Sequence, residues 1–409
     1  MVQTEARRPT VSVIIPAYNA EPFIHTAIQS VLDQTYPHVE VVVVDDGSTD
    51  GTAAAVQSFG ARVRYVYKAN GGLASAWNTG IQHCSGEILA FLDADDAWMP
   101  SLVERQVEVL VSRPEIDGAC VWARFVDEHG HLLPDVIGTS FNGDMLRQLL
   151  LGGNSMLFSM VTVRRGVFDR VGLFDPTFRQ AQDWNMTLRM AAAGIRFASI
   201  PSVLVQRRLH AASASADPER ALYWDLLVLK QAFATLALTP QVQALAPAAT
   251  FWVLHRAAMG NWRKGAQHAA VERLLEAFVT WPPALHRPQT YLVTIRRLQP
   301  SGFRSDPVVI PNLDRLTLEA TRLLNELFRR PTLPDVVRVH RRSAWAAFHA
   351  AVAVLNFGGR RWGKAAAYAV RSGLMHPVPA LRSAAAVALR STHAGRVDRQ
   401  AVAPVVRPR

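Results

Sequence analysis

Two groups of aspartates directly follow apolar runs of strand type, and they are the residues in this 409-residue chain best suited to chemistry. Asp93, Asp95 and Asp96 follow the run ILAFL, and Asp45 and Asp46 follow VEVVVV. Grouped carboxylates repel one another unless a cation lies among them. Their hard oxygen atoms are ligands that Mg²⁺ or Mn²⁺ accepts. The alternative is a solvated acidic turn that caps the next helix.

The segments around these aspartates predict alternating strands and helices. The expected strands cover 11–16, 39–44, 62–68 and 87–92, and the expected helices cover 21–33, 52–59, 73–83 and 100–111. This alternation predicts an α/β fold with a doubly wound, mainly parallel sheet. Ligands of such sheets bind past the carboxyl ends of the strands, so both aspartate groups would lie along one edge. The convergence favours a ligand site, and its layout suits a nucleotide diphosphate compound.

The charge of the chain is divided unevenly. Up to Ser215 there are 17 Lys and Arg against 22 Asp and Glu, and from Ala216 onward there are 27 against 11. The second part is therefore basic, and it could meet nucleic acid, an anionic membrane surface or an acidic polymer. Solvated arginine on helix surfaces is the alternative that we favour. Because no nucleic-acid-binding signature accompanies the charge, we expect no nucleic acid partner.

From Ala216 the sequence is rich in Ala, Leu and Arg and predicts an all-α domain over 216–391. The clearest helices are Tyr223–Leu238, Thr250–Met259, Gly265–Thr280, Leu313–Arg329, Ala344–Leu355 and Lys364–Leu374. The segments 260–266 and 358–365 are faintly alike, which fits tetratricopeptide-like hairpins, although packed helices of no repeat class fit as well. We expect residues 1–8 to be a tail and 392–409 to be a disordered basic tail.

The cysteines and the termini bear on the compartment. Cys84 and Cys120 give neither a disulfide framework nor a metal-ligand spacing. The N-terminus has no signal-peptide core, and no stretch has the length and apolarity of a membrane span. We expect a cytoplasmic protein, with peripheral contact to the inner face of the plasma membrane as a further expectation.

Seven segments, taken in order, resemble glycosyltransferase family 2, the inverting group with the GT-A fold. They are VSVIIPAYNA at 11–20, VVVVDDGSTDGT at 41–52, NGGLASAWNTGI at 70–81, GEILAFLDADDAWMP at 86–100, FSMVTVRRGVFDRVGLFDPTF at 158–178, AQDWNMTLRMAAAG at 181–194 and LVQRRLHAASAS at 204–215. The resemblance covers residues 9–215. It implies metal-dependent, inverting transfer of a sugar from a nucleotide diphosphate sugar, most simply a UDP-sugar, to a hydroxyl of a glycan, lipid-linked or protein acceptor. Bacterial polysaccharide synthesis is the expected setting.

The resemblance also assigns roles to individual residues. The nucleotide-sugar pocket would be lined by Pro16, Ala17, Tyr18, Asn19, Asp45, Asp46, Lys68, Asn70, Gly72, Asn78, Asp93, Ala94 and Asp95. Asp45 would bind the base, and Asp93 the ribose or the sugar. Asp95, with Asp93 and His210, would hold Mg²⁺ or Mn²⁺, which stabilises the departing diphosphate.

Asp183 is the expected general base. It would take the proton of the acceptor hydroxyl while the hydroxyl oxygen attacks the anomeric carbon. An aspartate at the start of a helix, as here, is also simply a good N-cap. Asn154, Ser155, Gln182 and Trp184 are expected on the acceptor side of the site.

Two positions depart from the family pattern. Gln182 stands where the family usually has Glu, which removes a charge beside Asp183. Trp77 stands where the family often has Arg, so a nucleotide contact of that Arg would be changed or missing. These departures keep a second interpretation open, in which the chain is a catalytically weak nucleotide-sugar-binding scaffold whose basic half binds a partner or a membrane surface. A sugar nucleotidyltransferase is discounted because the segment 16–23 lacks a Gly-rich basic loop.

Overall fold

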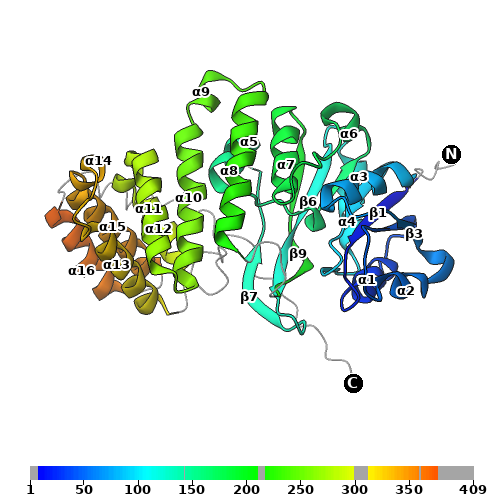
Figure 1. Ribbon diagram of the computed structural model, residues 1–409, viewed down its shortest axis with the longest axis horizontal. Helices are drawn as coiled ribbons and strands as arrows, with labels where there is room; N and C mark the ends of the chain where they lie inside the picture. Colours follow the sequence, from blue (N-terminus) through cyan, green and yellow to red (C-terminus); the bar gives the residue numbers. More distant parts are fainter. Residues whose placement is uncertain (1–7, 142, 211–216, 299–311, 359–360, 376–409) are drawn as a thin grey trace, which may run out of the picture. The chain divides into compact units, whose positions relative to one another are not determined.

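The computed structural model describes residues 8–141, 143–210, 217–298, 312–358 and 361–375 (Figure 1). The chain divides into two compact units, Met1–Ala257 and Ala258–Arg409, and each is described by itself. The expected tail at 392–409, and that at 1–8 apart from Arg8, lie outside the described residues.

The first unit contains a nine-stranded sheet, and one half of this sheet is parallel. Its strands pair in the order β3-β2-β1-β4 and are β1 (Val11–Ala17), β2 (Val39–Asp45), β3 (Arg64–Tyr67) and β4 (Ile88–Phe91). The connecting helices are α1 (Ile24–Leu32), α2 (Thr52–Gln57) and α3 (Leu73–His83), with the short helix η1 (Gly60–Arg62) before β3. All residues of β1 and β4 are buried, as continuous apolar runs in a covered parallel sheet should be.

The other half of the sheet is mixed. Its strands are β5 (Ala97–Trp98), β6 (Gly118–Val126), β7 (Leu132–Ile137), β8 (Val161–Arg164) and β9 (Phe197–Arg208). β8 runs antiparallel to both β4 and β6, whereas β6 runs parallel to β9. β5 pairs antiparallel with β9, and β7 with β6. The predicted parallel pairing thus holds where strand and helix alternate, and the pairing changes where that alternation ends.

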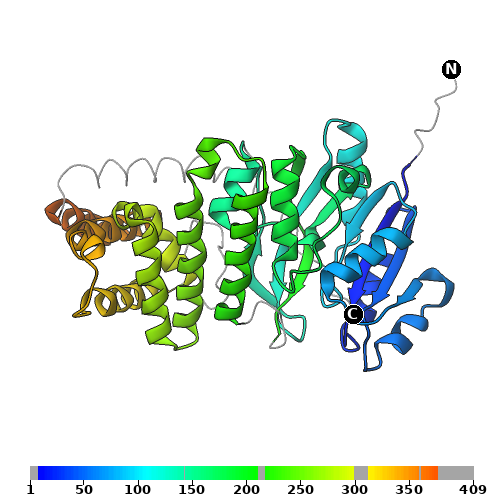
Figure 2. The ribbon, with the colours of Figure 1, turned by 45° about the horizontal axis from the view of Figure 1, so that its top comes forward.

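Helices complete the first unit. They are α4 (Leu102–Ser112), α5 (Met145–Gly152), η2 (Phe158–Met160), α6 (Gly166–Val171), α7 (Gln182–Ala192), α8 (Pro218–Thr235), α9 (Pro240–Gln243) and α10 (Ala246–Arg263), the last of which crosses the boundary between the units. α7 packs against α5 and α8. α8 and α10 run side by side (Figures 1 and 2), and Arg256 and Asp225 form an ion pair of 2.5 Å between them. Whether a domain that ends near Ser215 folds alone stays a prediction.

The described part of the second unit is helical, as predicted. Its helices are α11 (Gln267–Thr280), η4 (Pro282–His286), α12 (Pro288–Arg297), α13 (Leu313–Phe328), α14 (Asp335–Arg338), α15 (Arg341–Gly358) and α16 (Trp362–Met375). α15 packs against α12 and α16, and it buries alanines such as Ala347 and Ala351. Among the helices described, none combines the length and the apolar character that crossing a membrane requires. The tetratricopeptide-like hairpins remain a prediction.

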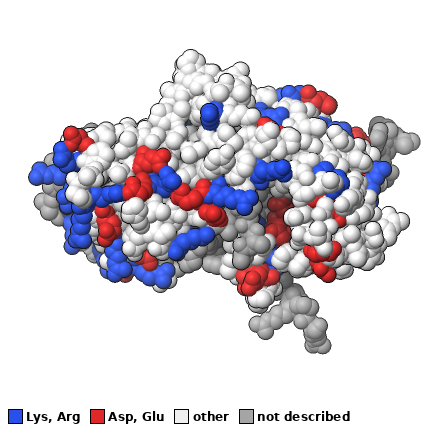
Figure 3. All heavy atoms as spheres, viewed as in Figure 1, with Lys and Arg blue, Asp and Glu red and all other residues white. Residues whose placement is uncertain are grey.

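The basic side chains of the second unit are partly paired. Arg330 pairs with Glu272, and Arg361 and Lys364 both pair with Asp314. On the face drawn in Figure 3, basic side chains are interspersed with acidic ones. This distribution fits the favoured alternative, in which the excess of arginine is a solvated helix surface.

Candidate functional site

Three carboxylates gather where β4 ends, close enough together to hold one metal ion. Ligand oxygen atoms of Asp93, Asp95 and Asp96 all lie within 4.8 Å of one another. Asp93 and Asp95 are half-buried, and Asp96 is buried. The amide of Asp96 donates to the carbonyl of Asp93 at 3.0 Å, and the amide of Asp93 donates to Ser159 Oγ at 3.1 Å. These bonds hold the turn so that it presents oxygen ligands of the kind that Mg²⁺ and Mn²⁺ take.

The acid triad, Asp93, Asp95 and Asp96, is under electrostatic strain. Burial, together with the charges of Asp96 and Asp95, raises the pKa of Asp93 well above its usual value. Burial and the charge of Asp95 raise the pKa of Asp96 to about 7. The guanidinium of Arg207 lowers both pKa values without offsetting these effects. A divalent cation among the three carboxylates would relieve their repulsion, so the residues present fit a metal site.

Residues at and just after the end of β9 contact the acid triad. The amide of Arg208 donates to Asp96 Oδ1 at 3.1 Å, and its Nε donates to the carbonyl of Asp95 at 3.2 Å. His210 Nε2 lies 2.9 Å from Asp95 Oδ2. Phe23 supports this end, with its ring 5.1 Å from that of His210 and 5.2 Å from the Arg208 guanidinium. His210 therefore lies beside the triad, and its role as a metal ligand stays a prediction.

Asp46 fastens the end of β2 to the loop before α3. Its Oδ1 accepts from Lys68 Nζ at 2.5 Å and from the amide of Gly71 at 2.9 Å. Its Oδ2 accepts from the amide of Gly72 at 2.7 Å. Because Asp46 is buried and fully engaged, we assign it the support of the loop 68–72.

Asp45 is also bound from within the protein. Its Oδ1 accepts from the amide of Ser48 at 2.8 Å, and its Oδ2 accepts from the Tyr65 hydroxyl at 2.7 Å. Burial and this hydrogen bond raise the pKa of the Tyr65 phenol. Asn19, at φ 48°, donates its amide to Ser48 Oγ and accepts from the amide of Thr49. Asp45 is 1% exposed and both of its oxygens are bonded within the protein, so its contact with a nucleobase stays a prediction.

The other predicted nucleotide contacts differ in exposure. Tyr18 is 54% exposed, and Asn70 is also exposed, so both present surface to a ligand. Pro16 and Ala17 are buried at the end of β1 and shape the pocket from within. Ala94 is half-buried in the turn of the triad.

Asn78 and Trp77 are used in packing. Asn78 Nδ2 donates to the carbonyl of Phe174 at 2.8 Å, and its Oδ1 accepts from the amide of Phe174 at 2.9 Å. With both ends occupied, Asn78 holds the loop after α6, and a nucleotide contact is not supported. Trp77 is 2% exposed, and its ring centroid lies 5.3 Å from that of Phe158 and 4.6 Å from that of Phe174. The departure from Arg at this position therefore belongs to an aromatic core.

Asp183 lies at the start of α7, and other groups orient its carboxylate. Its Oδ2 accepts from Asn154 Nδ2 at 2.5 Å, and its Oδ1 accepts from the amide of Trp184 at 2.8 Å. Ala181, at φ 56°, turns the chain into α7 through a left-handed conformation that residues with a Cβ rarely adopt. This turn and Asn154 together fix the direction of the carboxylate.

Asp183 and the acid triad share one electrostatic environment. Burial raises the pKa of Asp183, while the hydrogen bonds from Trp184 and Asn154 and the charge of Arg207 lower it. Asp183 is itself one of the groups that raise the pKa of Asp93. A candidate base and a candidate metal site thus lie close enough to interact, with Arg207 acting on both.

Of the remaining residues predicted on the acceptor side, Ser155 is partly exposed, whereas Gln182 and Trp184 are buried. Ser155 is half-buried and accepts from Thr139 Oγ1 at 2.9 Å. Gln182 is 6% exposed, and its buried side-chain oxygen has no hydrogen-bond partner within the described ranges of the chain. Trp184 has no exposed surface and lies under the Arg256 guanidinium, 5.7 Å from the ring. The side chain of Trp184 therefore belongs to the packing, and the expected acceptor contact through it is not supported.

Arg207 and Arg208 are site residues that the sequence reasoning missed. The hydrogen bond from Arg208 to Asp96 spans 112 positions, and no local pattern indicates a contact of that length. The available signal is a pair of arginines just before His210 in an otherwise acidic part of the chain.

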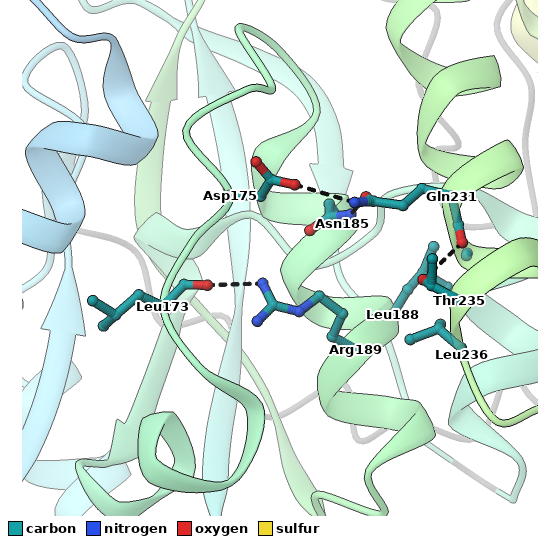
Figure 4. Close-up of a pocket in the computed structure, with 9 residues that line it drawn as sticks. Leu173, Asp175, Asn185, Leu188, Arg189, Gln231, Thr235 and Leu236 are labelled. Carbon is teal, nitrogen blue, oxygen red and sulfur yellow. Dashed lines mark hydrogen bonds between the residues drawn. The ribbon is translucent and has the colours of Figure 1, made fainter.

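A separate hollow of about 290 Å³ lies between α7, α8 and the loop after α6 (Figure 4). Gln231 bridges its polar side, donating to Asp175 Oδ2 at 3.1 Å and accepting from Asn185 Nδ2 at 2.6 Å. Arg189 points away from this bridge toward the carbonyl of Leu173. None of the predicted site residues lines the hollow.

Comparison with known proteins identifies the family. Residues 12–172 match the model of glycosyl transferase family 2. An uncharacterized glycosyltransferase of Rickettsia prowazekii is 32% identical over 220 residues, which cover 51% of this chain and 66% of that protein. The putative teichuronic acid biosynthesis glycosyltransferase TuaG of Bacillus subtilis is 43% identical over 110 residues, 26% of this chain and 44% of that protein. Chondroitin synthase of Escherichia coli is 32% identical over 219 residues, 52% of this chain and 31% of that protein.

A solved structure supports the fold. Residues 1–349 of S. aureus TarS, in complex with UDP-GlcNAc, superpose with a TM-score of 0.50 at 17% identity, over 82% of this chain and 91% of that one. At this identity the likeness concerns the fold alone, and the GT-A architecture implied by the resemblance is confirmed. The chain spans about two thirds or less of the length of the curated relatives named above. The part of the chain that carries the acid triad belongs to glycosyl transferase family 2.

Proposed function

We propose that this protein is a metal-dependent, inverting glycosyltransferase that moves a sugar from a nucleotide diphosphate sugar to a hydroxyl acceptor. The observation that carries the proposal is the acid triad lying within electrostatic reach of Asp183. The family match supports sugar transfer, and TuaG and chondroitin synthase favour a glycan product. UDP is the first nucleotide to test, and a glycan, lipid-linked or protein acceptor fits the proposal.

The donor half of the site consists of the strand ends. Asp45 would accept a base N–H, and the loop 68–72, supported by Asp46, would border the base and ribose. Asp95, Asp93 and His210 would hold Mg²⁺ or Mn²⁺. When bound, that ion supplies positive charge that stabilises the departing diphosphate.

Asp183 would perform the proton transfer. An acceptor hydroxyl seated beside Asp183 Oδ2 would give its proton to the carboxylate while its oxygen attacks the anomeric carbon from the side opposite the diphosphate. The carbon–oxygen bond to the diphosphate breaks as the new bond forms, so the anomeric centre inverts. Asn154 would hold the carboxylate in this direction, since its bond of 2.5 Å fixes Oδ2. A single base acting on the acceptor is what the inverting course requires.

Two finer expectations belong to the same proposal. We propose that residues 9–215 carry the transfer and that the arginines of the helices after Ala216 form a mainly solvated surface. A cytoplasmic localisation with peripheral contact to the inner face of the plasma membrane is consistent with this proposal. Cell fractionation, which separates soluble from membrane-bound protein, would test it.

Calorimetric titration of the full-length protein with UDP, GDP, CDP and dTDP, with and without Mn²⁺, tests the proposal. We expect one of the four to bind at least tenfold more tightly with Mn²⁺, because the cation neutralises both the triad and the diphosphate. A folded protein that binds none of them would contradict the proposal. It would favour the scaffold interpretation, in which the basic helices carry the function.

A further inference from the structure

Arg179 is an arginine of the first unit whose backbone is held in place while its guanidinium stays exposed. It is exposed, and in the part of the chain that the structure describes it has no hydrogen bond, ion pair or ring contact. Its neighbours Phe178 and Gln180 are 3% and 7% exposed, and Phe178 packs against Trp224 at 6.2 Å between ring centroids. Buried residues on both sides therefore fix the backbone of Arg179, while the guanidinium stays exposed.

The guanidinium of Arg179 lies over the loop that leads into α3. A Cβ built on Gly72 would come within 2.7 Å of Arg179 Nη1, and a Cβ built on Gly71 would come within 2.7 Å of Lys68 Nζ. Gly72 also has φ +86°, a conformation that favours glycine. The two adjacent glycines thus leave room for two cations to approach the same stretch of backbone.

The charges at this loop do not balance. Lys68 is neutralised by Asp46 at 2.5 Å, whereas among the described residues no carboxylate forms an ion pair with Arg179. The first turn of α3 adds partial positive charge from its unpaired N–H groups. An unpaired guanidinium beside a helix start is a surface that attracts an oxyanion.

The position of Arg179 connects the two halves of the proposed site. It precedes Asp183 by four residues and lies over the loop 68–72, which we place beside the nucleotide. The segment that carries the candidate general base, Asp183, thus also places the guanidinium of Arg179 on the donor side of the site.

We propose that Arg179 binds an oxyanion of the sugar donor. This inference rests on the proposed function. A phosphate of the diphosphate and a carboxylate of an acidic sugar share the required chemistry, because each presents two oxygens that match the guanidinium fork. Binding of the donor would then also restrain the segment that leads to Asp183.

The test is calorimetric titration of full-length wild type and Arg179→Gln, in Mn²⁺, with UDP, UDP-glucose and UDP-glucuronic acid. We expect the Kd of the variant to rise roughly 10- to 100-fold, the range of hydrogen bonds to charged groups. A rise for all three probes would assign Arg179 to the diphosphate, and a rise for UDP-glucuronic acid alone would assign it to a sugar carboxylate. Arg179→Lys should recover part of the loss, because it keeps the charge without the fork.

Arg62→Gln is the matched control. Arg62 is an exposed arginine of η1, before the amino end of β3, whereas the proposed site lies past the carboxyl ends of the strands. Its Kd values should equal those of wild type. If wild type binds UDP, and Arg179→Gln binds each of the three probes with the same Kd as wild type, this inference alone is overturned. If wild type prefers another of the four nucleotides, that nucleotide and its sugar forms replace UDP in the same design. A wild-type protein that binds no nucleotide overturns the proposed function as well.

Discussion

Asn154→Ala should shift the pH dependence of the proposed reaction to higher pH. Asn154 Nδ2 donates to Asp183 Oδ2 at 2.5 Å, and this bond favours the ionised form of the carboxylate. Asp183 must be ionised to act as a base, and burial already raises its pKa. Removing the donor therefore raises that pKa further, so the variant should lose activity at low pH and keep most of it at high pH.

The size of the shift follows from the strength of the lost bond. Hydrogen bonds to charged groups contribute about 1.5–3 kcal/mol, and one pKa unit corresponds to about 1.4 kcal/mol. The acidic limb of the pH–rate profile should thus move up by about 1–2 units. At a pH below both limbs, this amounts to a loss of roughly 10- to 100-fold in rate.

The assay is the release of nucleoside diphosphate from the donor between pH 5 and 9, with water as the acceptor. Ser155→Ala is the matched control, because Ser155 contacts Thr139 and has no bond to Asp183. The acidic limb of the control should lie at the same pH as that of wild type, whatever the overall rate of the control. An Asn154→Ala profile that falls uniformly, with its acidic limb unmoved, would refute the assignment of Asp183 as a base tuned by Asn154.

Two further predictions concern stability. In metal-free protein, Asp96 should contribute a loss of stability as the pH rises through about 7, because its raised pKa, about 7, makes the folded state bind more protons at this site than the unfolded state does. Asp96→Asn should remove part of this slope and add roughly 2–4 kcal/mol at pH 8, measured by denaturant unfolding. Trp77→Arg should destabilise by roughly 3–5 kcal/mol, because it places a charge in an aromatic core, whereas Trp77→Phe should cost about 1–2 kcal/mol.

Each of these predictions has a clear contrary result. Carboxylates with lowered pKa values, such as Glu40, are already ionised above pH 5.5. His349, whose pKa burial lowers to about 4, adds stability as the pH rises through about 6.5, so wild type is compared with Asp96→Asn, in which this contribution is the same. A difference in stability between wild type and Asp96→Asn that stays constant between about pH 5.5 and 8 would contradict the raised pKa of Asp96. A Trp77→Arg protein as stable as wild type would show that position 77 can face a ligand.

The sequence predicted the first half of the fold well, for a physical reason. Continuous apolar runs bounded by turn residues, such as Val41–Val44, are typical of strands covered on both faces, and the four parallel strands and their helices lie within three residues of the predicted bounds. β6 and β9 gave no comparable prediction. Their pairing depends on contacts between distant segments, such as Gly118 beside Phe197.

The sequence predicted which positions surround the candidate site, but it did not predict the direction in which each side chain points. Neighbouring helix residues point about 100° apart, so Asp183 can face the site while Trp184 enters the core. Asn78 carries the right chemistry for a nucleotide contact, yet the backbone of Phe174 occupies both of its ends. A resemblance specifies which residues match, and packing decides which of them are available.

The compact unit that contains the sheet continues past the composition change at Ala216. Gln231 of α8 bonds to Asn185 of α7 and to Asp175, so α8 covers polar groups of the family domain. The compact unit accordingly runs to Ala257. Charge and composition describe the solvent-exposed surface of α8, whereas the C-terminal boundary of the first unit depends on the buried face of this helix.

The central claim is that the acid triad binds the donor with a metal ion while Asp183 acts on the acceptor. Calorimetric titration of UDP into wild type, Asp95→Asn and Asp183→Asn, each with and without Mn²⁺, tests this division most directly. We predict that Asp95→Asn loses the Mn²⁺-dependent gain in affinity and that Asp183→Asn keeps it, although neither variant should catalyse transfer. Equal loss of nucleotide binding in both variants, or no loss in Asp95→Asn, would contradict the account.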